Sequence, residues 1–161
     1  MGSKKNELTV GNIAPQLHLR DSNSNEVRLE DMKGRWVVLY FYPKDNTSGC
    51  TQEAIDFSRS KKEFEKLNAV ILGVSPDSTE SHCKFAEKHN LSITLLSDTQ
   101  HGVLENYGAW QLKKMYGKEY MGVERSTFLI DPEGRIRKIW RKVRVKGHVE
   151  EVQDMLQELT G

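Results

Sequence analysis

The clearest pattern along the chain is an unbroken apolar and aromatic run, WVVLYFY, at residues 36–42. Its length and its β-branched and aromatic residues are typical of a strand buried on both faces of a sheet. Pro43 ends this predicted strand, and the polar residues 45–49 provide the turn and helix-capping chemistry expected after it. A helical pattern follows over about residues 50–67, with four expected buried positions: Ile55, Phe57, Phe64 and Leu67.

The remaining pattern predicts further strands and helices in alternation. Apolar residues that alternate around the turn-rich residues 21–25 predict an N-terminal β-hairpin. Asp77 and Glu80 have the spacing of a capping box at the start of the next helix. The other expected elements are strands at 69–74 and 93–96, helices at 79–90, 103–107 and 148–159, and a hairpin of strands 128–130 and 136–140. This order predicts an α/β fold with a central mixed sheet flanked by helices, whose functional site lies at the carboxyl ends of the strands.

Composition narrows the class of protein. The 161 residues fit one domain covering 1–161, and the net charge of +1 gives no general attraction to nucleic acid or to an anionic membrane. A mean hydropathy of −0.64 and the lack of a long apolar run exclude a membrane span. Residues 1–7 are polar, so we expect them to be flexible and to contain no secretory signal. Two cysteines form no disulfide scaffold, which favours a reducing compartment, the cytoplasm.

The predicted elements place Cys50 in the first turn of a helix, just beyond the carboxyl end of a central strand. Free backbone N–H groups and the positive end of the helix dipole favour a thiolate over a thiol at that position. Position by itself leaves two interpretations open, a reactive cysteine and a small buried residue that packs well.

The neighbours of Cys50 favour the reactive interpretation. A thioredoxin-like oxidoreductase has Cys-x-x-Cys at this turn, but the earlier position here is Thr47, so no local disulfide can form. The Thr47 hydroxyl can instead hydrogen-bond a substrate oxygen, and Pro43 can shield the sulfur from water without adding a donor. The pattern Pro43-x-x-x-Thr47-x-x-Cys50 closely resembles the active-site signature of the peroxiredoxins.

The resemblance extends along most of the chain. ERSTFLID at residues 124–131 is similar to the strand that carries the family's active-site arginine, here Arg125. MYGK at 115–118 with GVERSTF at 122–128 points to the Q-type branch, also called bacterioferritin comigratory protein. Further matching motifs occur in the same order: VGNIAP at 10–15, FYPK at 41–44, LGVS at 72–75 and LLSD at 95–98. The resemblance implies a thioredoxin-like fold.

It also implies a thiol peroxidase that reduces hydrogen peroxide and small organic hydroperoxides. In that family mechanism the Cys50 thiolate attacks the terminal peroxide oxygen and becomes a sulfenic acid. Arg125 keeps Cys50 ionised and donates to the peroxide oxygens, Thr47 hydrogen-bonds the incoming peroxide, and Pro43 shields the pocket. Glu53 matches the acidic residue that orients the arginine. No cofactor or metal is implied, because sulfur carries the redox chemistry.

Cys83 departs from the commonest pattern of this branch. Many Q-type enzymes carry a resolving cysteine five residues after the attacking one, where this chain has Ile55. A subset places it on the next helix, and Cys83 lies on that predicted helix, about one turn earlier than in related sequences. We therefore expect Cys83 to resolve Cys50, thioredoxin or a similar thiol to be the reductant, and the protein to be a monomer or weak dimer. The alternatives are a one-cysteine peroxidase and a peroxide sensor or holdase in which Cys83 is incidental.

Two other clusters favour structural explanations. Residues 135–148, RIRKIWRKVRVKGH, contain seven Lys or Arg, but these alternate with apolar residues, which favours a solvated strand face over a nucleic-acid site. His82, Cys83 and His89 lie on one predicted helix, but adjacent residues point about 100° apart and a zinc site needs three or four converging ligands. We therefore predict no metal, nucleic-acid or membrane partner. Three aromatics could line a substrate groove, although packing is their default explanation: Trp110, Tyr116 and Tyr120.

Overall fold

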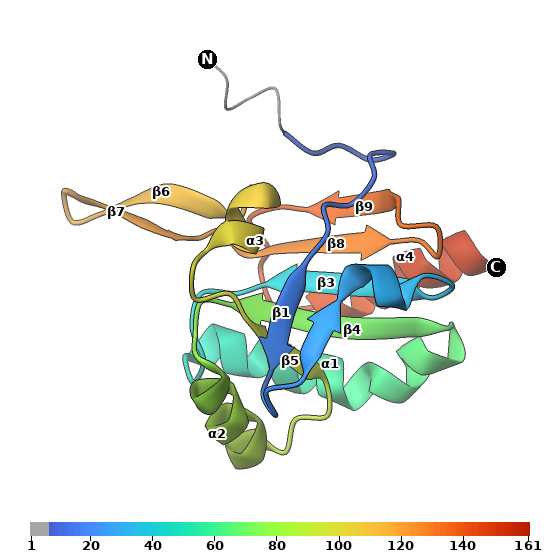
Figure 1. Ribbon diagram of the computed structural model, residues 1–161, viewed down its shortest axis with the longest axis horizontal. Helices are drawn as coiled ribbons and strands as arrows, with labels where there is room; N and C mark the ends of the chain where they lie inside the picture. The colour runs from blue at the N-terminus through green and yellow to red at the C-terminus, as the bar shows by residue number, and fades with distance from the viewer. Residues whose placement is uncertain (1–6) are drawn as a thin grey trace.

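The computed structural model describes residues 7–161, and its centre is a mixed seven-stranded sheet (Figure 1). The expected flexibility of residues 1–7 therefore lies, except at Glu7, outside the described residues. The strand order is β2-β1-β5-β4-β3-β8-β9, with β3 parallel to β4 and antiparallel to β8. The strands of this sheet are β1 (His18–Asp21), β2 (Glu26–Arg28), β3 (Trp36–Phe41), β4 (Ala69–Ser75), β5 (Thr94–Ser97), β8 (Ser126–Ile130) and β9 (Ile136–Trp140). The predicted mixed sheet and N-terminal hairpin are thus confirmed.

Helices cover both faces of the sheet. They are η2 (Leu29–Met32), α1 (Ser48–Lys66), α2 (Thr79–His89), α3 (Gly102–Asn106) and α4 (His148–Thr160). All six residues of β3 are buried, and alternate ones contribute to two separate hydrophobic clusters. One cluster joins β3 to α1, α2 and α4, and the other joins it to η2 and α3. Burial on both faces explains why the 36–42 run is continuously apolar.

Helix α1 follows β3 directly, as predicted, and this junction positions the site. Phe57 and Phe64 are buried, whereas Ile55 and Leu67 are half-buried because they lie beside the buried stripe of α1. The predicted capping box at α2 is wrong: the helix is capped by Ser78, whose Oγ accepts from the Ser81 N–H at 3.1 Å. Among residues 7–161, no helix has both the length and the apolar character that crossing a membrane requires.

A two-stranded ribbon of β6 (Trp110–Met115) and β7 (Lys118–Val123) projects from the body of the molecule (Figure 1). The sequence patterns did not predict it. Tyr116, at its tip, is 96 % exposed and Tyr120 is 43 % exposed, so packing is the wrong explanation for these two aromatics. Trp110, at the base, is half-buried and its ring stacks on His101 with 3.9 Å between centroids.

The basic stretch begins on the edge strand β9, which pairs with β8. Ile136 is buried and Arg137 is exposed, as the interpretation of a solvated strand face predicts. Arg141 turns back over the Phe128 ring, with its guanidinium carbon 5.1 Å from the ring centroid. Part of the positive charge therefore serves local packing.

Candidate active site

The turn between β3 and α1 presents Cys50 at a helix start. After Pro43 the chain turns at Asn46, which adopts the left-handed conformation with φ of 64°. Thr47 is the extended residue before α1, and its hydroxyl donates to the Lys44 carbonyl at 2.9 Å instead of capping the helix. Cys50, in the first turn, is 1 % exposed. Its sulfur therefore lies at the positive end of α1 and away from bulk water.

Arg125 joins the sulfur to a buried carboxylate. It lies between β7 and β8, and its Nη2 donates to Cys50 Sγ at 3.3 Å while its Nη1 donates to Glu53 Oε1 at 2.5 Å. Glu53 lies on α1 about one turn after Cys50, and its side chain is fully buried. A β-carbon at Gly49 would lie 3.3 Å from Arg125 Nη2, so glycine leaves room for the guanidinium against the helix start. These contacts hold the cation beside the sulfur.

Burial and charge act in opposite directions on this pair. Burial lowers the pKa of Arg125, but the carboxylate of Glu53 and the Cys50 sulfur outweigh it and raise the pKa above its usual value. For Glu53 burial is the largest influence and raises the pKa to about 7, although Arg125 opposes the shift. Glu53 Oε2 also has no hydrogen-bond partner among residues 7–161. The arginine therefore remains charged, while its carboxylate partner is close to its protonation point at neutral pH.

Two more buried polar side chains surround this centre. The Tyr40 ring stacks on Phe57 with 4.6 Å between centroids, and burial, reinforced by the charge of Glu53, raises the Tyr40 pKa well above its usual value. At the start of α4, the His148 Nε2 and the Thr127 hydroxyl are hydrogen-bonded at 2.8 Å. Burial and the nearby positive charge of Arg125 lower the His148 pKa to about 4. Both side chains are therefore neutral at pH 7, which leaves Arg125 as the cation in contact with Cys50.

The structure brings together four of the predicted site residues at the start of α1. Cys50, Arg125 and Glu53 are in direct contact, and Thr47 begins the same helix. Pro43 is half-buried at the beginning of the loop that leads to it. Cys83 is different, because it is exposed on α2 and both cysteines are free thiols.

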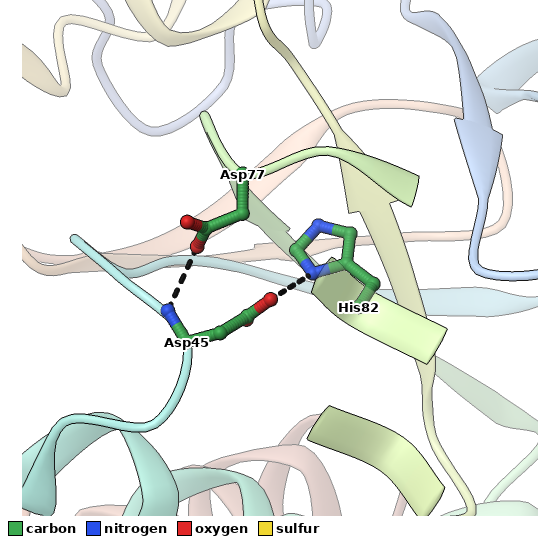
Figure 2. A group of neighbouring side chains, drawn as sticks. All are labelled: Asp45, Asp77 and His82. Atoms are coloured by element: carbon green, nitrogen blue, oxygen red, sulfur yellow. Dashed lines mark hydrogen bonds and ion pairs between the residues drawn. The ribbon is translucent and has the colours of Figure 1, made fainter. Parts of the chain in front are cut away.

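A buried polar cluster around Asp45, in the middle of the Pro43–Thr47 loop, was not predicted (Figure 2). His82 does not converge with Cys83 and His89; its ring lies beside Asp45 and near Asp77. The carboxylate oxygens there are already occupied: Asp45 accepts from Tyr42 at 2.6 Å and Ser81 at 2.7 Å. Asp77 Oδ2 in turn accepts from the Asp45 backbone and the Ser75 hydroxyl, both at 2.7 Å. This saturation favours a hydrogen-bonded cluster over a metal site.

Comparison with known proteins gives consistent matches along the chain. Residues 10–139 match the model of the AhpC/TSA family. The chain is 55 % identical over 153 residues to "Peroxiredoxin Bcp" of Bacillus subtilis, covering 95 % of this chain and 98 % of that protein. It is 40 % identical over 153 residues, with the same coverage, to "Peroxiredoxin Bcp" of Escherichia coli K12.

Solved structures agree with these sequence matches. A structure of the Xanthomonas campestris bacterioferritin comigratory protein, from work on its alkyl peroxide reduction activity, has a TM-score of 0.87. It is 42 % identical to this chain, and the match covers 90 % of this chain and 92 % of that one. This likeness confirms the predicted thioredoxin-like fold.

Proposed function

This chain belongs to the AhpC/TSA family as a Q-type (Bcp) peroxiredoxin, a thiol-dependent peroxidase, and from this premise we propose that Cys50 is the sulfur that attacks the peroxide. One observation carries the proposal: the guanidinium of Arg125 donates to the buried Cys50 Sγ at 3.3 Å. A fixed cation and a helix N-terminus at one sulfur favour the thiolate, which is the nucleophilic form.

The first chemical step follows from this arrangement. The Cys50 thiolate attacks the terminal oxygen of the peroxide, an S–O bond forms and the O–O bond breaks. Sulfur is oxidised to the sulfenic acid, and the departing oxygen takes the bonding electrons and then a proton from water. Arg125 and the free N–H groups in the first turn of α1 stabilise the negative charge that develops on the oxygens. The Thr47 hydroxyl already donates to Lys44, so its free lone pairs can accept a hydrogen bond from the peroxide.

Hydrogen peroxide and small organic hydroperoxides are the proposed substrates. The burial of Cys50 supports small molecules, since a bulky group could not approach the sulfur without displacing the loop that begins at Pro43. The alkyl peroxide reduction described for the Xanthomonas campestris relative supports the organic hydroperoxides.

Cys83 is the proposed resolving residue. Its thiolate would attack the sulfur of the Cys50 sulfenic acid, forming an S–S bond and breaking the S–O bond, and the departing hydroxide takes up a proton to become water. A disulfide needs the two Cα atoms within about 7 Å, so we expect local unwinding at the start of α1 and in α2. Thioredoxin or a similar thiol reductant would then reduce the disulfide, because Cys83 is exposed. Two free thiols suit a reducing compartment, for which we propose the cytoplasm.

The decisive experiment treats the wild-type, Cys50→Ser and Cys83→Ser proteins with one equivalent of peroxide. Intact mass and nonreducing peptide mapping should find a Cys50–Cys83 bond in the wild type, a sulfenic acid in Cys83→Ser, and no peroxide consumption by Cys50→Ser. Peroxide consumption by Cys50→Ser at the wild-type rate would exclude Cys50 as the attacking sulfur.

The same experiment tests the alternative of a one-cysteine peroxidase. That alternative has one observation in its favour, namely that Cys83 is on a separate helix and unbonded to Cys50. A sulfenic or sulfinic acid in the wild type, together with normal thioredoxin-driven turnover by Cys83→Ser, would establish it.

A further inference from the structure

We propose that the buried ion pair between Asp45 and His82 is a latch, which holds the loop before Cys50 against α2 and must open before Cys83 can reach Cys50. The proposal rests on the resolving role proposed for Cys83. Asp45 and His82 are therefore positioning residues, and they set how readily the site leaves the closed arrangement in which Arg125 contacts the sulfur.

The latch joins two segments that are far apart in sequence. Asp45 lies in the loop between β3 and α1, and His82 is the fourth residue of α2 (Figure 2). His82 Nδ1 and Asp45 Oδ2 are 2.8 Å apart, and the two side chains are only 0 % and 2 % exposed. Such a short contact in a water-free position holds the loop and the helix in one relative placement.

The hydrogen-bond partners of the two side chains favour an ionic pair. His82 Nε2 is 2.9 Å from the Leu96 carbonyl, which can only accept, so this nitrogen must carry a proton. The hydroxyls of Tyr42 and Ser81 both donate to Asp45, as expected for an ionised carboxylate. Because an ionised carboxylate also only accepts, His82 Nδ1 must donate to it as well. In the ionic form, both His82 nitrogens donate, one to the Asp45 carboxylate and one to the Leu96 carbonyl.

A second contact ties the same loop to the start of α2. The backbone N–H of Asp45 donates to Asp77 Oδ2 at 2.7 Å, two residues before α2 begins. The Ser75 hydroxyl donates to the same oxygen at 2.7 Å and fixes its position at the end of β4. Asp45 is thus held through both its side chain and its backbone, and its side-chain contacts with His82 and Ser81 are the ones that depend on α2 being wound.

The positions of the two cysteines explain why the contact between Asp45 and His82 should affect disulfide formation. Cys83 is the residue after His82, so unwinding α2 to move Cys83 toward Cys50 also pulls His82 away from Asp45. Separating one partner from a buried ion pair leaves an uncompensated charge, which strongly opposes the movement. The latch should therefore prolong the closed arrangement after Cys50 has been oxidised.

A longer-lived closed arrangement has a chemical cost. The Cys50 sulfenic acid, as its anion, can attack a second peroxide, forming another S–O bond and breaking the O–O bond to give a sulfinic acid and water or alcohol. Disulfide formation competes with this reaction, because it consumes the same sulfenic acid. The strength of the latch should therefore set the ratio of disulfide to sulfinic acid at high peroxide.

The test compares wild type with His82→Gln, Asp45→Asn and the double variant, and uses His89→Gln as the matched control. His89 lies on the same helix, against Phe85, and outside the latch. In single-turnover mixing with peroxide, removing the latch should speed disulfide formation about tenfold or more, since it removes a buried charge pair. The sulfinic fraction at excess peroxide should fall in parallel, and sulfenic acid formation should change much less.

The outcomes separate the latch from a merely structural role. A wild-type ratio of disulfide to sulfinic acid in the His82→Gln and Asp45→Asn proteins would overturn the proposal. A wild-type rate of disulfide formation in a folded His82→Gln protein would overturn it too. If His82→Gln does not fold, the neutral double variant, which leaves no unpaired charge, provides the same comparison.

A further experiment tests the latch independently of the proposed role of Cys83. If the wild type forms no Cys50–Cys83 bond, the resolving role fails, but hydrogen exchange can still be measured in a Cys83→Ser background. His82→Gln should then speed exchange of the backbone amides of residues 44–50 about tenfold, because opening of the loop becomes easier. Unchanged exchange would show that the pair does not hold the loop.

Discussion

The two cysteines occupy opposite environments in one small fold. Cys50 is buried in the first turn of α1, beside the guanidinium of Arg125, whereas Cys83 is exposed in α2. A buried sulfur next to a cation is suited to attack on a small substrate. An exposed sulfur is suited to exchange with another protein. This comparison indicates that the two proposed roles differ because the two thiols have different surroundings in the folded protein. Their sequence neighbours alone do not account for the difference.

The contrast can be tested by changing the surroundings of Cys50. The largest effect is expected from Arg125→Ala. It should slow the reaction of Cys50 with peroxide about 10²- to 10³-fold, as loss of a transition-state hydrogen-bond donor typically does. Stopped-flow rates measured across pH would separate two causes. Loss of thiolate would be recovered at high pH, but loss of the donors would not, and we expect no full recovery.

Alkylation of Cys83 provides the internal control for that variant. Arg125 contacts Cys50 and Glu53, so the alkylation rate of Cys83 in Arg125→Ala should stay at its wild-type value. Arg144→Ala, which removes an exposed cation from the basic stretch, should leave both cysteines unaffected. Complete recovery of the Arg125→Ala rate at high pH would show that the arginine acts through ionisation of the thiol only.

A smaller effect is expected in the pH dependence of the free energy of unfolding. It should come from Glu53, which lies near Cys50. Burial raises the Glu53 pKa from 4.5 to about 7, so between these values the folded protein holds a proton that the unfolded chain releases. The free energy of unfolding should therefore fall as pH rises through this range, by at most about 3 kcal/mol. Glu53→Gln should abolish this fall, as measured by urea unfolding at pH 5 and pH 8.

The matched control for Glu53→Gln is a substitution on α2, the helix that carries Cys83. Glu87→Gln changes an exposed residue of α2 and should keep the wild-type pH dependence. An equal fall in stability for wild type and Glu53→Gln would mean that the Glu53 carboxyl is not the group that takes up the proton.

The smallest effect should come from the cap of α2. Ser78→Ala removes the acceptor for the Ser81 N–H and should destabilise the helix start by about 1 kcal/mol. The rate of disulfide formation should rise about fivefold at most, since 1.4 kcal/mol corresponds to a factor of ten. Peroxide attack by Cys50 should be unaffected. Ser60→Ala, within α1, is the control. An equal rise in the rate of disulfide formation in that variant would show that the effect does not come from the start of α2.

The site could be anticipated where it depends on local sequence. The apolar run at 36–42 and the polar turn after it located the start of α1, and hence Cys50, to within two residues. Arg125 contacts Glu53, and the orienting role that the family resemblance implies for Glu53 stays a prediction. The geometry of this contact depends on burial, which makes the Glu53 carboxyl hard to ionise, and burial of a charged residue leaves no sign in the sequence.

The features that were missed depend on tertiary structure. Asp45 and His82 are 37 residues apart, and their sequence neighbours indicated a turn and a helix, with no sign of a pair. Sequence spacing groups His82 with Cys83 and His89, which share its helix but point elsewhere. Ser78 caps α2 because Asp77 is already engaged by Asp45 and Ser75, and spacing alone does not reveal that competition.

The β6–β7 ribbon escaped prediction for a different reason. Its strands pair with each other and with no other strand of the described residues, so it has little alternation of buried and exposed positions. Leu112 and Met121, directly opposite each other, are both exposed. A pattern method that relies on burial has no signal in such a segment.

The ribbon also has a practical consequence for anyone who wishes to label this enzyme. Tyr116 and Gly117 form its tip, both with positive φ, in a tight turn that projects into solvent. A dye, an affinity tag or a surface tether attached at this turn would leave the packed layers untouched. Because β7 runs from the tip to Val123, two residues before Arg125, an optical probe placed there would be connected through a single strand to the residue that contacts the Cys50 sulfur.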